Sequence, residues 1–353
     1  MTARETNTDR VAKKQKDLWD QSQYLVCVSE GTILKRIILS SPVFLLVCFL
    51  CTLSWSSNYT ISVSQIVQHP SLDAMRQGFM DYLAEKGLQV KYNIHIAGGN
   101  PATNLQIASR IIAEDPDLVL TISTPSSQAC AQKIKGKTIL FAGVTDPVGA
   151  GLVKSLEKPG ANITGTTDMS PIDRHIMLMK EIHPKLKKLG VIYNPGEANS
   201  VTLVKALKKE SAQLDIVVQE AKAVKAAVVG KVARSIVSSC DAVYIPTDNT
   251  VISRLEIVAK ICGENKVPLY TADVDSVPRG AVAALAIDYY RLGRQTGSMA
   301  ERIFNGGNPA TMPVETVDKL RLHVNVTAAA KMGVELPVNL ILAADAVFDS
   351  FPP

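Results

Sequence analysis

The run LVLTI at residues 118–122 ends directly on the tract STPSSQ at residues 123–128. An apolar run that stops on small polar residues is typical of a buried strand that leads into a helix. Five further segments repeat this order, and they are ISVSQIV then QHPSLD (61–73), TILFAGV then TDPVGAGL (138–152), LGVIY then NPGEANS (189–200), AVYI then PTDNT (242–250) and VPLY then TADVDS (267–276). Because the ends of parallel strands meet at one edge of a sheet, we expect the six polar tracts to converge on one cleft.

The composition is that of an ordinary globular protein. With 353 residues, 46% of them apolar and 20% charged, the chain can bury a large core, and its length favours two domains over one. The formal net charge is only +5 and the Lys and Arg residues are spread along the chain, so no nucleic-acid partner is indicated. Neither a metal-ligand spacing nor a dinucleotide fingerprint is present, and we therefore expect no cofactor.

The N-terminal segment is expected to lie outside the fold. An apolar run at residues 37–53 follows a basic pair and precedes a small polar stretch, and it is too short for a comfortable membrane span. Residues 35–57 are therefore interpreted as a secretory signal sequence. The polar leader at residues 1–34 is longer than such signals normally carry. We hypothesise that translation begins at an alternative codon near Val28 or Leu34.

The cysteines do not form the pattern of a disulfide framework. Three of them are widely spaced in mostly apolar settings and are interpreted as small buried side chains, namely Cys130, Cys240 and Cys262. Cys27, Cys48 and Cys51 belong to the N-terminal segment. The residues before Cys48 resemble a lipoprotein processing box, although Val47 stands where Gly, Ala or Ser is usual. Lipid anchoring through Cys48 or Cys51 and plain cleavage are both left open.

Strands and helices alternate regularly from about residue 60. The first series predicts strands at 60–67, 89–96, 118–122 and 138–142 and helices at 70–86, 101–114 and 125–133. The second predicts helices at 172–182, 198–212, 224–238, 249–263 and 289–305 and strands at 188–193, 214–219, 242–245, 267–270 and 281–288. Two such series predict an α/β fold of two doubly wound parallel-sheet lobes.

The boundary between the lobes is expected in the extended stretch 162–171, which has no helical periodicity. The helix at 289–305 is expected to return to the first lobe, so that the chain crosses between the lobes more than once in a multi-strand hinge. The predicted lobes are 58–168 plus about 289–312, and 169–286 plus about 318–345.

Several long segments resemble one protein family in the same order, and they are HPSLDAMRQGF (69–79), FAGVTDPVGAGLV (141–153), VIYNPGEANS (191–200), YIPTDNTV (244–251), DVDSVPRGAVA (273–283) and IDYYRLGRQTG (287–297). They are similar to the solute-binding proteins of bacterial ABC importers of the tryptophan/tyrosine type. The resemblance implies a type I periplasmic-binding-protein fold, whose two lobes close around a small molecule and hand it to a membrane permease. It also implies a monomer in the periplasm or on the outer face of the cytoplasmic membrane. Since several relatives are associated with aromatic amino acids, the expected ligand is an amino acid, with tryptophan, tyrosine or phenylalanine favoured.

Polar residues at the strand ends of the first lobe are candidate ligand contacts. Thr124 and Ser126 open a helix, so their hydroxyls and the free amides of that helix would suit a carboxylate, with simple capping as the alternative. Asp146 is either a turn residue or a ligand contact. His69 and Leu72 are expected to form the pocket for the ligand side chain. The full set on this lobe is Gln65, His69, Leu72, Thr124, Ser126, Thr145 and Asp146.

The second lobe is expected to supply a carboxylate for the ligand ammonium, because a buried charge needs a partner. Asp248 is the first choice and Asp273 the second. Glu197 lies near a predicted helix start, where the helix dipole alone would favour it. The full set on this lobe is Asn194, Glu197, Asn199, Ser200, Asp248, Asn249 and Asp273.

Enzyme motifs are absent from the sequence. It contains no G-x-S-x-G elbow, no P-loop and no His paired by motif with a nucleophile, so we do not expect catalysis. A secreted hydrolase that uses strand-end carboxylates is the weaker alternative. A ligand-binding sensor component, acting on a receptor rather than a permease, is left open. A sugar-repressor type of regulator is excluded, because an export signal stands where its helix-turn-helix would lie.

Overall fold

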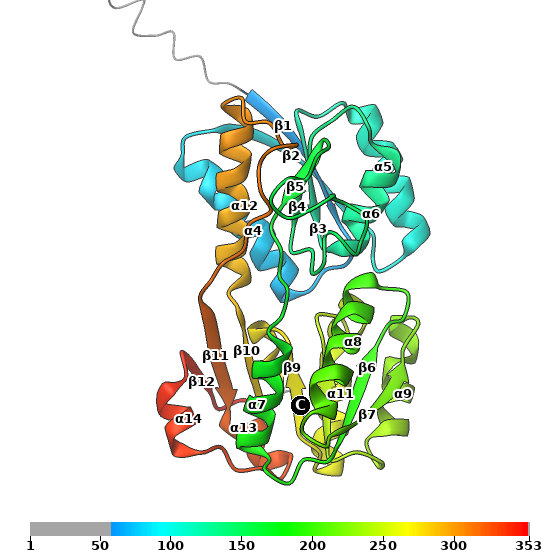
Figure 1. Cartoon of the computed structure of the whole chain (residues 1–353), viewed down its shortest axis with the longest axis vertical. Helices are drawn as coiled ribbons and strands as arrows, with labels where there is room; N and C mark the ends of the chain where they lie inside the picture. The colour runs from blue at the N-terminus through cyan, green and yellow to red at the C-terminus, as the bar shows by residue number, and fades with distance from the viewer. Residues whose placement is uncertain (1–57, 352–353) are drawn as a thin grey trace, which may run out of the picture. The chain divides into compact units, whose positions relative to one another are not determined.

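The computed structural model describes residues 58–351. The predicted leader, the predicted signal sequence and their three cysteines lie outside the described residues. Within the described part, no helix is long and apolar enough to cross a membrane. The described residues build two sheets, each flanked by helices (Figure 1).

The first sheet is entirely parallel, with the strand order β2-β1-β3-β4-β5. Its strands are β1 (Asn58–Gln65), β2 (Gln89–Ile96), β3 (Leu118–Ile122), β4 (Ile139–Ala142) and β5 (Ile163–Gly165). Its helices are α4 (Pro70–Glu85), α5 (Pro101–Glu114), α6 (Thr124–Lys133) and α12 (Tyr289–Phe304). The register pairs Gln65 at the end of β1 with Ile122 at the end of β3, which brings two of the polar tracts side by side.

The second sheet has the order β12-β11-β10-β9-β8-β6-β7 and is parallel except between β10 and β11. Its strands are β6 (Lys188–Tyr193), β7 (Val217–Lys222), β8 (Ala242–Ile245), β9 (Leu269–Thr271), β10 (Ala283–Ile287), β11 (Leu320–Asn325) and β12 (Ala346–Phe348). Its helices are α7 (Ile172–Ile182), α8 (Ala198–Ala212), η1 (Ala226–Val228), α9 (Val229–Ile236), α10 (Asn249–Ile252), α11 (Leu255–Asn265), η2 (Val274–Ser276), α13 (Val326–Lys331) and α14 (Val338–Ala343).

The predicted fold of two doubly wound α/β lobes is confirmed, with local differences in the second lobe. The strand predicted at 214–219 begins only at Val217, because the backbone N–H of Ile216 donates to the carbonyl of Ser211 and Asp215 adopts a left-handed φ of 55°. These residues close α8 instead of extending the sheet. The helix predicted at 249–263 is interrupted between α10 and α11, and β11 and β12 had no predicted counterpart.

Helix α12 returns to the first lobe and packs directly on α4 (Figure 1). A Cβ added to Gly293 would lie 1.9 Å from the carbonyl oxygen of Met75, and one added to Gly78 would lie 2.1 Å from that of Tyr290. The two helix backbones can approach this closely only because each presents a glycine at the contact. Because α12 lies between β10 and β11 in the chain but packs on the first lobe, the described chain passes between the lobes three times. These passages run from β5 to α7, from β10 to α12 and from α12 to β11.

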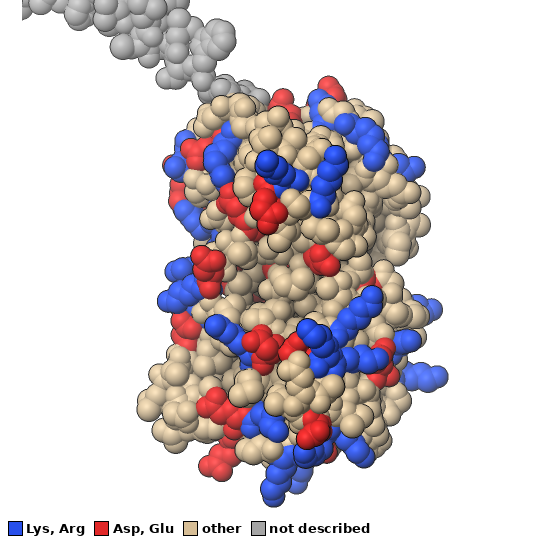
Figure 2. Space-filling view, viewed as in Figure 1, with Lys and Arg blue, Asp and Glu red and all other residues tan. Residues whose placement is uncertain are grey.

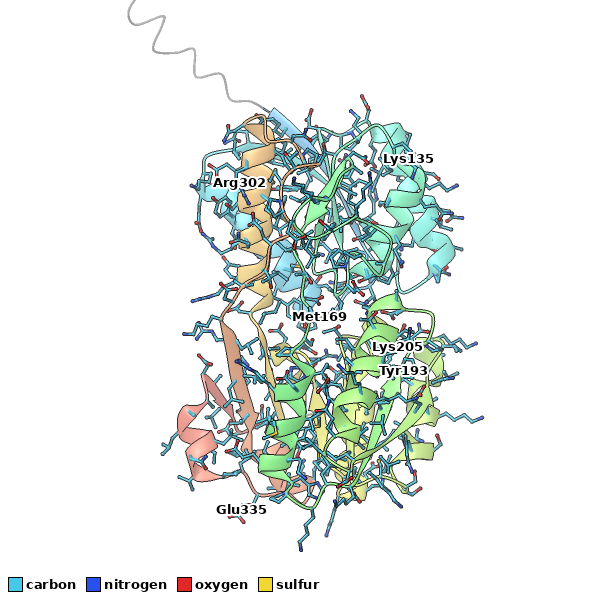
Figure 3. All side chains as sticks on the ribbon, in the orientation of Figure 1. Lys135, Met169, Tyr193, Lys205, Arg302 and Glu335 are labelled. Atoms are coloured by element: carbon cyan, nitrogen blue, oxygen red, sulfur yellow. The ribbon has the colours of Figure 1, made fainter. Side chains whose placement is uncertain are left out.

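Each lobe has its own hydrophobic core. Cys130 lies in the first core, and Cys240 and Cys262 lie in the second. All three are buried and free, which confirms the interpretation that they are small buried side chains. The exposed Met169 marks the junction of the lobes in Figure 3, in the segment between β5 and α7. On the face shown in Figure 2, charged side chains of both signs are interspersed over both lobes.

We predict that Gly293→Ala lowers the free energy of unfolding by about 1–3 kcal/mol, because the added methyl group meets the backbone of α4. Urea denaturation measures this change. Gly136→Ala is the matched control, since a Cβ at Gly136 would meet no atom within 4 Å. Equal stability of the two variants would contradict the close contact between α12 and α4.

Candidate functional site

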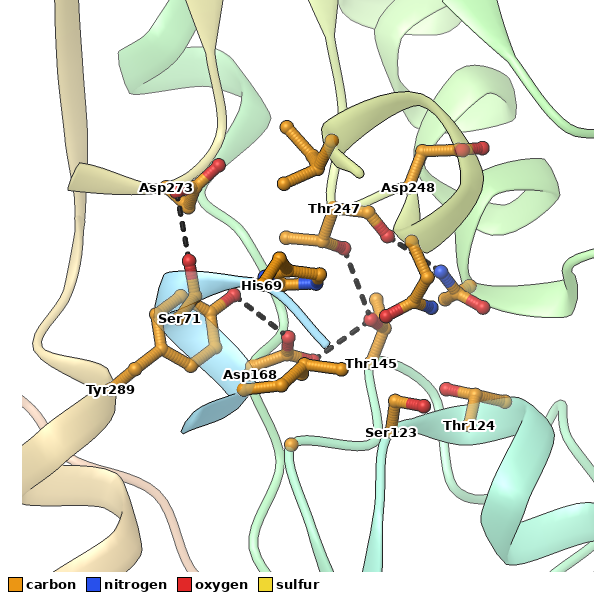
Figure 4. A pocket seen from close by; sticks show the side chains of 15 residues that line it. His69, Ser71, Ser123, Thr124, Thr145, Asp168, Thr247, Asp248, Asp273 and Tyr289 are labelled. Atoms are coloured by element: carbon orange, nitrogen blue, oxygen red, sulfur yellow. Dashed lines mark hydrogen bonds between the residues drawn. The ribbon is translucent and has the colours of Figure 1, made fainter. Parts of the chain in front are cut away.

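A cavity lies at the junction of the two sheets, where the carboxyl ends of their strands face each other (Figure 4). It encloses about 360 Å³, including the part that is open to solvent. The lining residues are His69, Ser71, Leu72, Ser123, Thr124, Gly143, Thr145, Asp168, Asn199, Thr247, Asp248, Asn249, Ile252, Asp273 and Tyr289.

Each of the six polar tracts contributes to this lining. The tracts after β1, β3 and β4 supply residues of the first lobe, and those after β6, β8 and β9 supply residues of the second. One representative of each tract, in chain order, is His69, Thr124, Thr145, Asn199, Asp248 and Asp273. The parallel sheets thus bring the polar strand ends to one place, as expected from their position in the sequence.

The start of α6 presents two hydroxyl groups that have no partner. Ser123 has φ 79° and ψ 162°, a backbone conformation that residues other than glycine rarely adopt, and its side chain makes no capping hydrogen bond. Ser123 Oγ and Thr124 Oγ1 are both buried without a hydrogen-bond partner. The positive end of the helix dipole lies at the same place. This end of the cavity is therefore suited to an anionic group.

Asp168 lines the cavity from the segment that connects β5 to α7, and its side chain is buried. Thr145 Oγ1 donates to Asp168 Oδ1 at 2.8 Å, and the Tyr289 hydroxyl donates to Oδ2 at 3.0 Å. Burial raises the pKa of the Asp168 carboxyl, and these two hydrogen bonds oppose the rise. Since an ionised carboxylate can accept about four hydrogen bonds, each oxygen retains an open acceptor position.

Asp248 is largely engaged within its own lobe. It is the N-cap of α10, where its Oδ1 accepts from the backbone N–H of Val251 at 2.8 Å. Its Oδ2 accepts at 2.6 Å from both the backbone N–H of Asn194 and Ser200 Oγ. Burial raises the pKa of Asp248 to about 8, and the neighbouring Glu197 carboxylate adds to the rise. Three of its roughly four acceptor positions are thus filled without a ligand.

Glu197 stabilises the start of α10 rather than that of its own helix. Although it precedes α8, its side chain makes no capping bond there. Its Oε2 accepts from the backbone N–H of Asn249 at 3.1 Å, and its Oε1 from that of Thr250 at 3.0 Å. The neighbouring Asn199 donates to the carbonyl of Thr247 at 2.5 Å, and its Oδ1 is buried without a partner. The polar side chains of the second lobe are therefore fixed by hydrogen bonds within that lobe, and Asn199 Oδ1 remains an open acceptor.

Two hydrogen bonds cross the cleft beside the cavity. Ser71 Oγ of the first lobe donates to Asp273 Oδ1 of the second at 3.0 Å, and Thr145 Oγ1 lies 3.4 Å from Thr247 Oγ1 (Figure 4). Asp273 also accepts from Ser276 through both oxygens, at 2.9 and 2.7 Å from the Ser276 hydroxyl. The lobes are thus in direct polar contact.

His69 is the buried imidazole of the cavity. Its side chain is 8% exposed and its Nδ1 has no hydrogen-bond partner. Burial lowers the pKa of His69 to about 4, although the Asp273 carboxylate opposes the shift. The imidazole is therefore neutral near pH 7. Among residues 58–351, no three His, Cys, Asp or Glu side chains are grouped so that they could hold a metal ion.

Some residues predicted from the sequence do not line the cavity. Asp146 acts as a turn residue, since its Oδ1 accepts from the backbone N–H of Gly149 at 2.8 Å. Ser126 Oγ donates to Asn104 at 3.3 Å in the interior of the first lobe. The complete set of predicted residues that lie outside the lining is Gln65, Ser126, Asp146, Asn194, Glu197 and Ser200.

The lining also contains seven residues outside the predicted set, which are Ser71, Ser123, Gly143, Asp168, Thr247, Ile252 and Tyr289. Ser71, Ser123 and Thr247 stand within the polar tracts or directly beside them, so that their position alone was a usable signal. Asp168 is the only carboxylate in the extended stretch 162–171 between the two series of elements. A single carboxylate in the segment that joins the two lobes is the sequence feature that could have identified Asp168 as a site residue.

Comparison with known proteins gives a family and close relatives. The family model described as ABC transporter substrate binding protein matches residues 60–348. A tyrosine-binding protein of Clostridioides difficile (strain R20291) is 40% identical over 269 residues, which cover 75% of this chain and 78% of the relative. Both matches span the two lobes.

Two solved structures differ in how well they superpose. A Streptococcus pneumonia ABC domain in complex with L-Trp is 32% identical and gives a TM-score of 0.80, over 83% of this chain and 100% of that one. A ligand-free, open substrate binding protein with adhesive properties from Clostridium difficile is 38% identical but gives only 0.63, over 83% and 99%. In this structure the two hydrogen bonds across the cleft hold the lobes in contact, which is a closed arrangement.

We predict that protonation of His69 destabilises this closed, folded form. Because burial lowers its pKa from 6.5 to about 4, the stability associated with the neutral imidazole is present above pH 6.5 and is lost as the pH falls toward 4. At pH 5 the loss amounts to about 2 kcal/mol. Urea denaturation at pH 7 and pH 5 should therefore show a smaller loss of stability in His69→Asn than in the wild type.

The comparison between the two proteins isolates His69 from other groups. Burial raises the pKa of Asp248 and of Asp275, so these carboxyls favour the folded form as the pH falls, with the opposite sign. They are present in both proteins and cancel in the difference. An identical loss of stability in the wild type and in His69→Asn would refute the prediction.

Proposed function

This chain belongs to the ABC transporter substrate binding protein family, and we propose that it binds an aromatic L-amino acid between its two lobes and delivers it to a membrane permease. Support for an aromatic ligand comes from the relative named for tyrosine and from the structural neighbour in complex with L-Trp. Support for the position of the ligand comes from the cavity between the lobes.

The observation that carries the proposal is a set of buried polar atoms in the cavity that lack partners. The hydroxyls of Ser123 and Thr124 stand at the start of α6, and Asn199 Oδ1 is an open acceptor on the opposite lobe. Buried polar groups are normally hydrogen-bonded, so unpaired atoms gathered in one cavity indicate a missing ligand. An amino acid has the complementary groups, because its carboxylate accepts hydrogen bonds and its ammonium donates them.

We assign the carboxylate of the ligand to the start of α6. The hydroxyls of Ser123 and Thr124 can donate to it, and the helix dipole favours a negative charge there. The strained backbone of Ser123 is consistent with a binding role, because strain of this kind is concentrated at functional sites.

We assign the ammonium of the ligand to Asp168 rather than to Asp248 or Asp273. Asp168 receives two hydrogen bonds from the protein, whereas Asp248 receives three. Asp273 faces three donor groups, which are the Ser71 hydroxyl, the Ser276 backbone N–H and the Ser276 hydroxyl. Asp168 therefore retains the most capacity for a donor such as an ammonium group.

The aromatic ring is assigned to the apolar part of the lining. Leu72 of α4 and Ile252 of α10 stand on opposite lobes, and Tyr289 adds an aromatic side chain. Because these side chains come from both lobes, a bound ring contacts both and favours the closed arrangement over the open one. Ligand binding then shifts the equilibrium toward the closed arrangement.

We further propose that the protein acts as a monomer outside the cytoplasmic membrane. This rests on the family, whose members bind solutes for ABC transporters, and on the signal sequence interpreted at residues 35–57. A lipid anchor at Cys48 or Cys51 would keep the protein beside its permease.

Isothermal titration calorimetry with L-tyrosine, L-tryptophan and L-phenylalanine tests the proposed ligand class. We expect at least one of the three to bind, and L-glutamate not to bind, because a second carboxylate would be buried without a partner. A ligand present at about 100 times its dissociation constant should also add about 2.7 kcal/mol to the free energy of unfolding. No binding of any aromatic amino acid would refute the proposal.

The isosteric variant Asp168→Asn tests the ammonium assignment. Because a hydrogen bond to a charged group contributes about 1.5–3 kcal/mol, the variant should bind the best aromatic amino acid about 10- to 100-fold more weakly. An analogue of the ligand that lacks the ammonium should not show this loss. Asp248→Asn is the matched control, and it should mainly lower the free energy of unfolding, because the amide nitrogen cannot accept the hydrogen bonds that both carboxylate oxygens of Asp248 receive within the second lobe. A greater loss of affinity in Asp248→Asn than in Asp168→Asn would reverse the assignment.

A further inference from the structure

One unpaired nitrogen in the cavity has no part in binding the ligand carboxylate or ammonium as proposed above. His69 precedes α4, and its Nδ1 is buried without a hydrogen-bond partner. In Figure 4 the ring lies among the central side chains, between Ser71 and Thr247, and Ser123 and Thr124 stand apart from it at the start of α6. The unpaired nitrogen therefore stands at a different part of the cavity from the proposed carboxylate site.

The surroundings of His69 combine apolar and polar side chains. Leu72 follows it by three positions at the start of α4. On the opposite lobe, Asn249 and Ile252 have the same spacing on α10. All four residues line the cavity. Two aliphatic side chains thus provide contact for a ring, and the imidazole adds a polar atom beside them.

The charge state of His69 suits a neutral partner. Burial lowers its pKa to about 4, and the Arg279 guanidinium acts in the same direction. The Asp273 carboxylate, the Asn249 side chain and the Asp73 carboxylate act against this shift. In the neutral imidazole one nitrogen donates and the other accepts. Nδ1 can therefore accept from a phenol O–H or an indole N–H in one tautomer, and donate to a phenol oxygen in the other.

We infer that His69 is a specificity-determining residue, which pairs with a hydrogen-bonding group on the ring of the ligand and so selects tyrosine or tryptophan over phenylalanine. This inference rests on the proposed function, since it concerns the side chain of an aromatic amino acid bound in the same cavity. Phenylalanine would fill the space between Leu72 and Ile252 but would leave His69 Nδ1 unpaired. A site built to pair with a ligand O–H or N–H discriminates strongly against an analogue that lacks it.

Calorimetric titration of three proteins with L-tyrosine, L-tryptophan and L-phenylalanine tests the inference. We expect the wild type to bind tyrosine or tryptophan at least about 10-fold more tightly than phenylalanine. In His69→Leu this preference should fall below about threefold, because the polar ligand loses its partner while phenylalanine does not. His69→Gln retains a donor and an acceptor, and should keep part of the preference.

Leu72→Ala is the control variant for the shape of the pocket. It removes an apolar contact that all three rings would share, so it should weaken the three amino acids in parallel and leave the preference unchanged. A selective effect of His69→Leu beside a parallel effect of Leu72→Ala would identify His69 as the residue that recognises the polar group.

The possible failures separate the inference from the function on which it rests. If no aromatic amino acid binds, both fail. If phenylalanine binds the wild type as tightly as tyrosine and tryptophan, the proposed function stands and the inference is overturned. A parallel loss of all three ligands in His69→Leu would also overturn it, because His69 would then contact the carboxylate or ammonium that the ligands share.

Discussion

The free-energy cost of burying polar groups between two lobes is the constraint on which this structure depends. The parallel sheets direct six polar tracts toward one junction, and the closed arrangement removes many of their side chains from water. A buried polar group that has no hydrogen-bond partner lowers the stability of the folded protein. Most of the groups pair within the protein, but four atoms of the lining do not, and they are His69 Nδ1, Ser123 Oγ, Thr124 Oγ1 and Asn199 Oδ1.

The two lobes meet this constraint in different ways. In the second lobe, Asp248 and Glu197 bind the backbone amides and side chains around the start of α10, so this wall is already assembled. In the first lobe, the start of α6 has no cap, and Ser123 is held in an unfavourable conformation. On the second-lobe side of the cavity the carboxylates are therefore hydrogen-bonded within the protein. On the first-lobe side the hydroxyls at the start of α6 have no partner.

Asp168 connects the cavity to the hinge. It lies in the first passage of the chain between the lobes, and its donor Tyr289 begins α12 directly after the second passage. A cation placed on Asp168 would therefore interact with two of the connecting segments at once. The close contact between α12 and α4, made through Gly78 and Gly293, holds the start of α12, which carries Tyr289, in the first lobe. Ligand binding and lobe closure are coupled through short, well-packed elements, which fits a population shift between two rigid lobes.

The amino-acid pattern by itself determined the alternation of strands and helices, the two sheets, and the edge at which polar residues gather, because these follow from local periodicity and from the geometry of parallel strands. It did not determine which polar residues remain available there. Glu197 and Thr250 are 53 positions apart, yet the Glu197 carboxylate accepts a hydrogen bond from the backbone N–H of Thr250. Asp168 lies in the stretch 162–171, which the sequence pattern identified only as the boundary between the lobes. The return of α12 to the first lobe places the Tyr289 hydroxyl within hydrogen-bond distance of Asp168. Only the tertiary structure decided these pairings, since a hydrogen bond depends on the distance between two atoms in space and not on their separation along the chain.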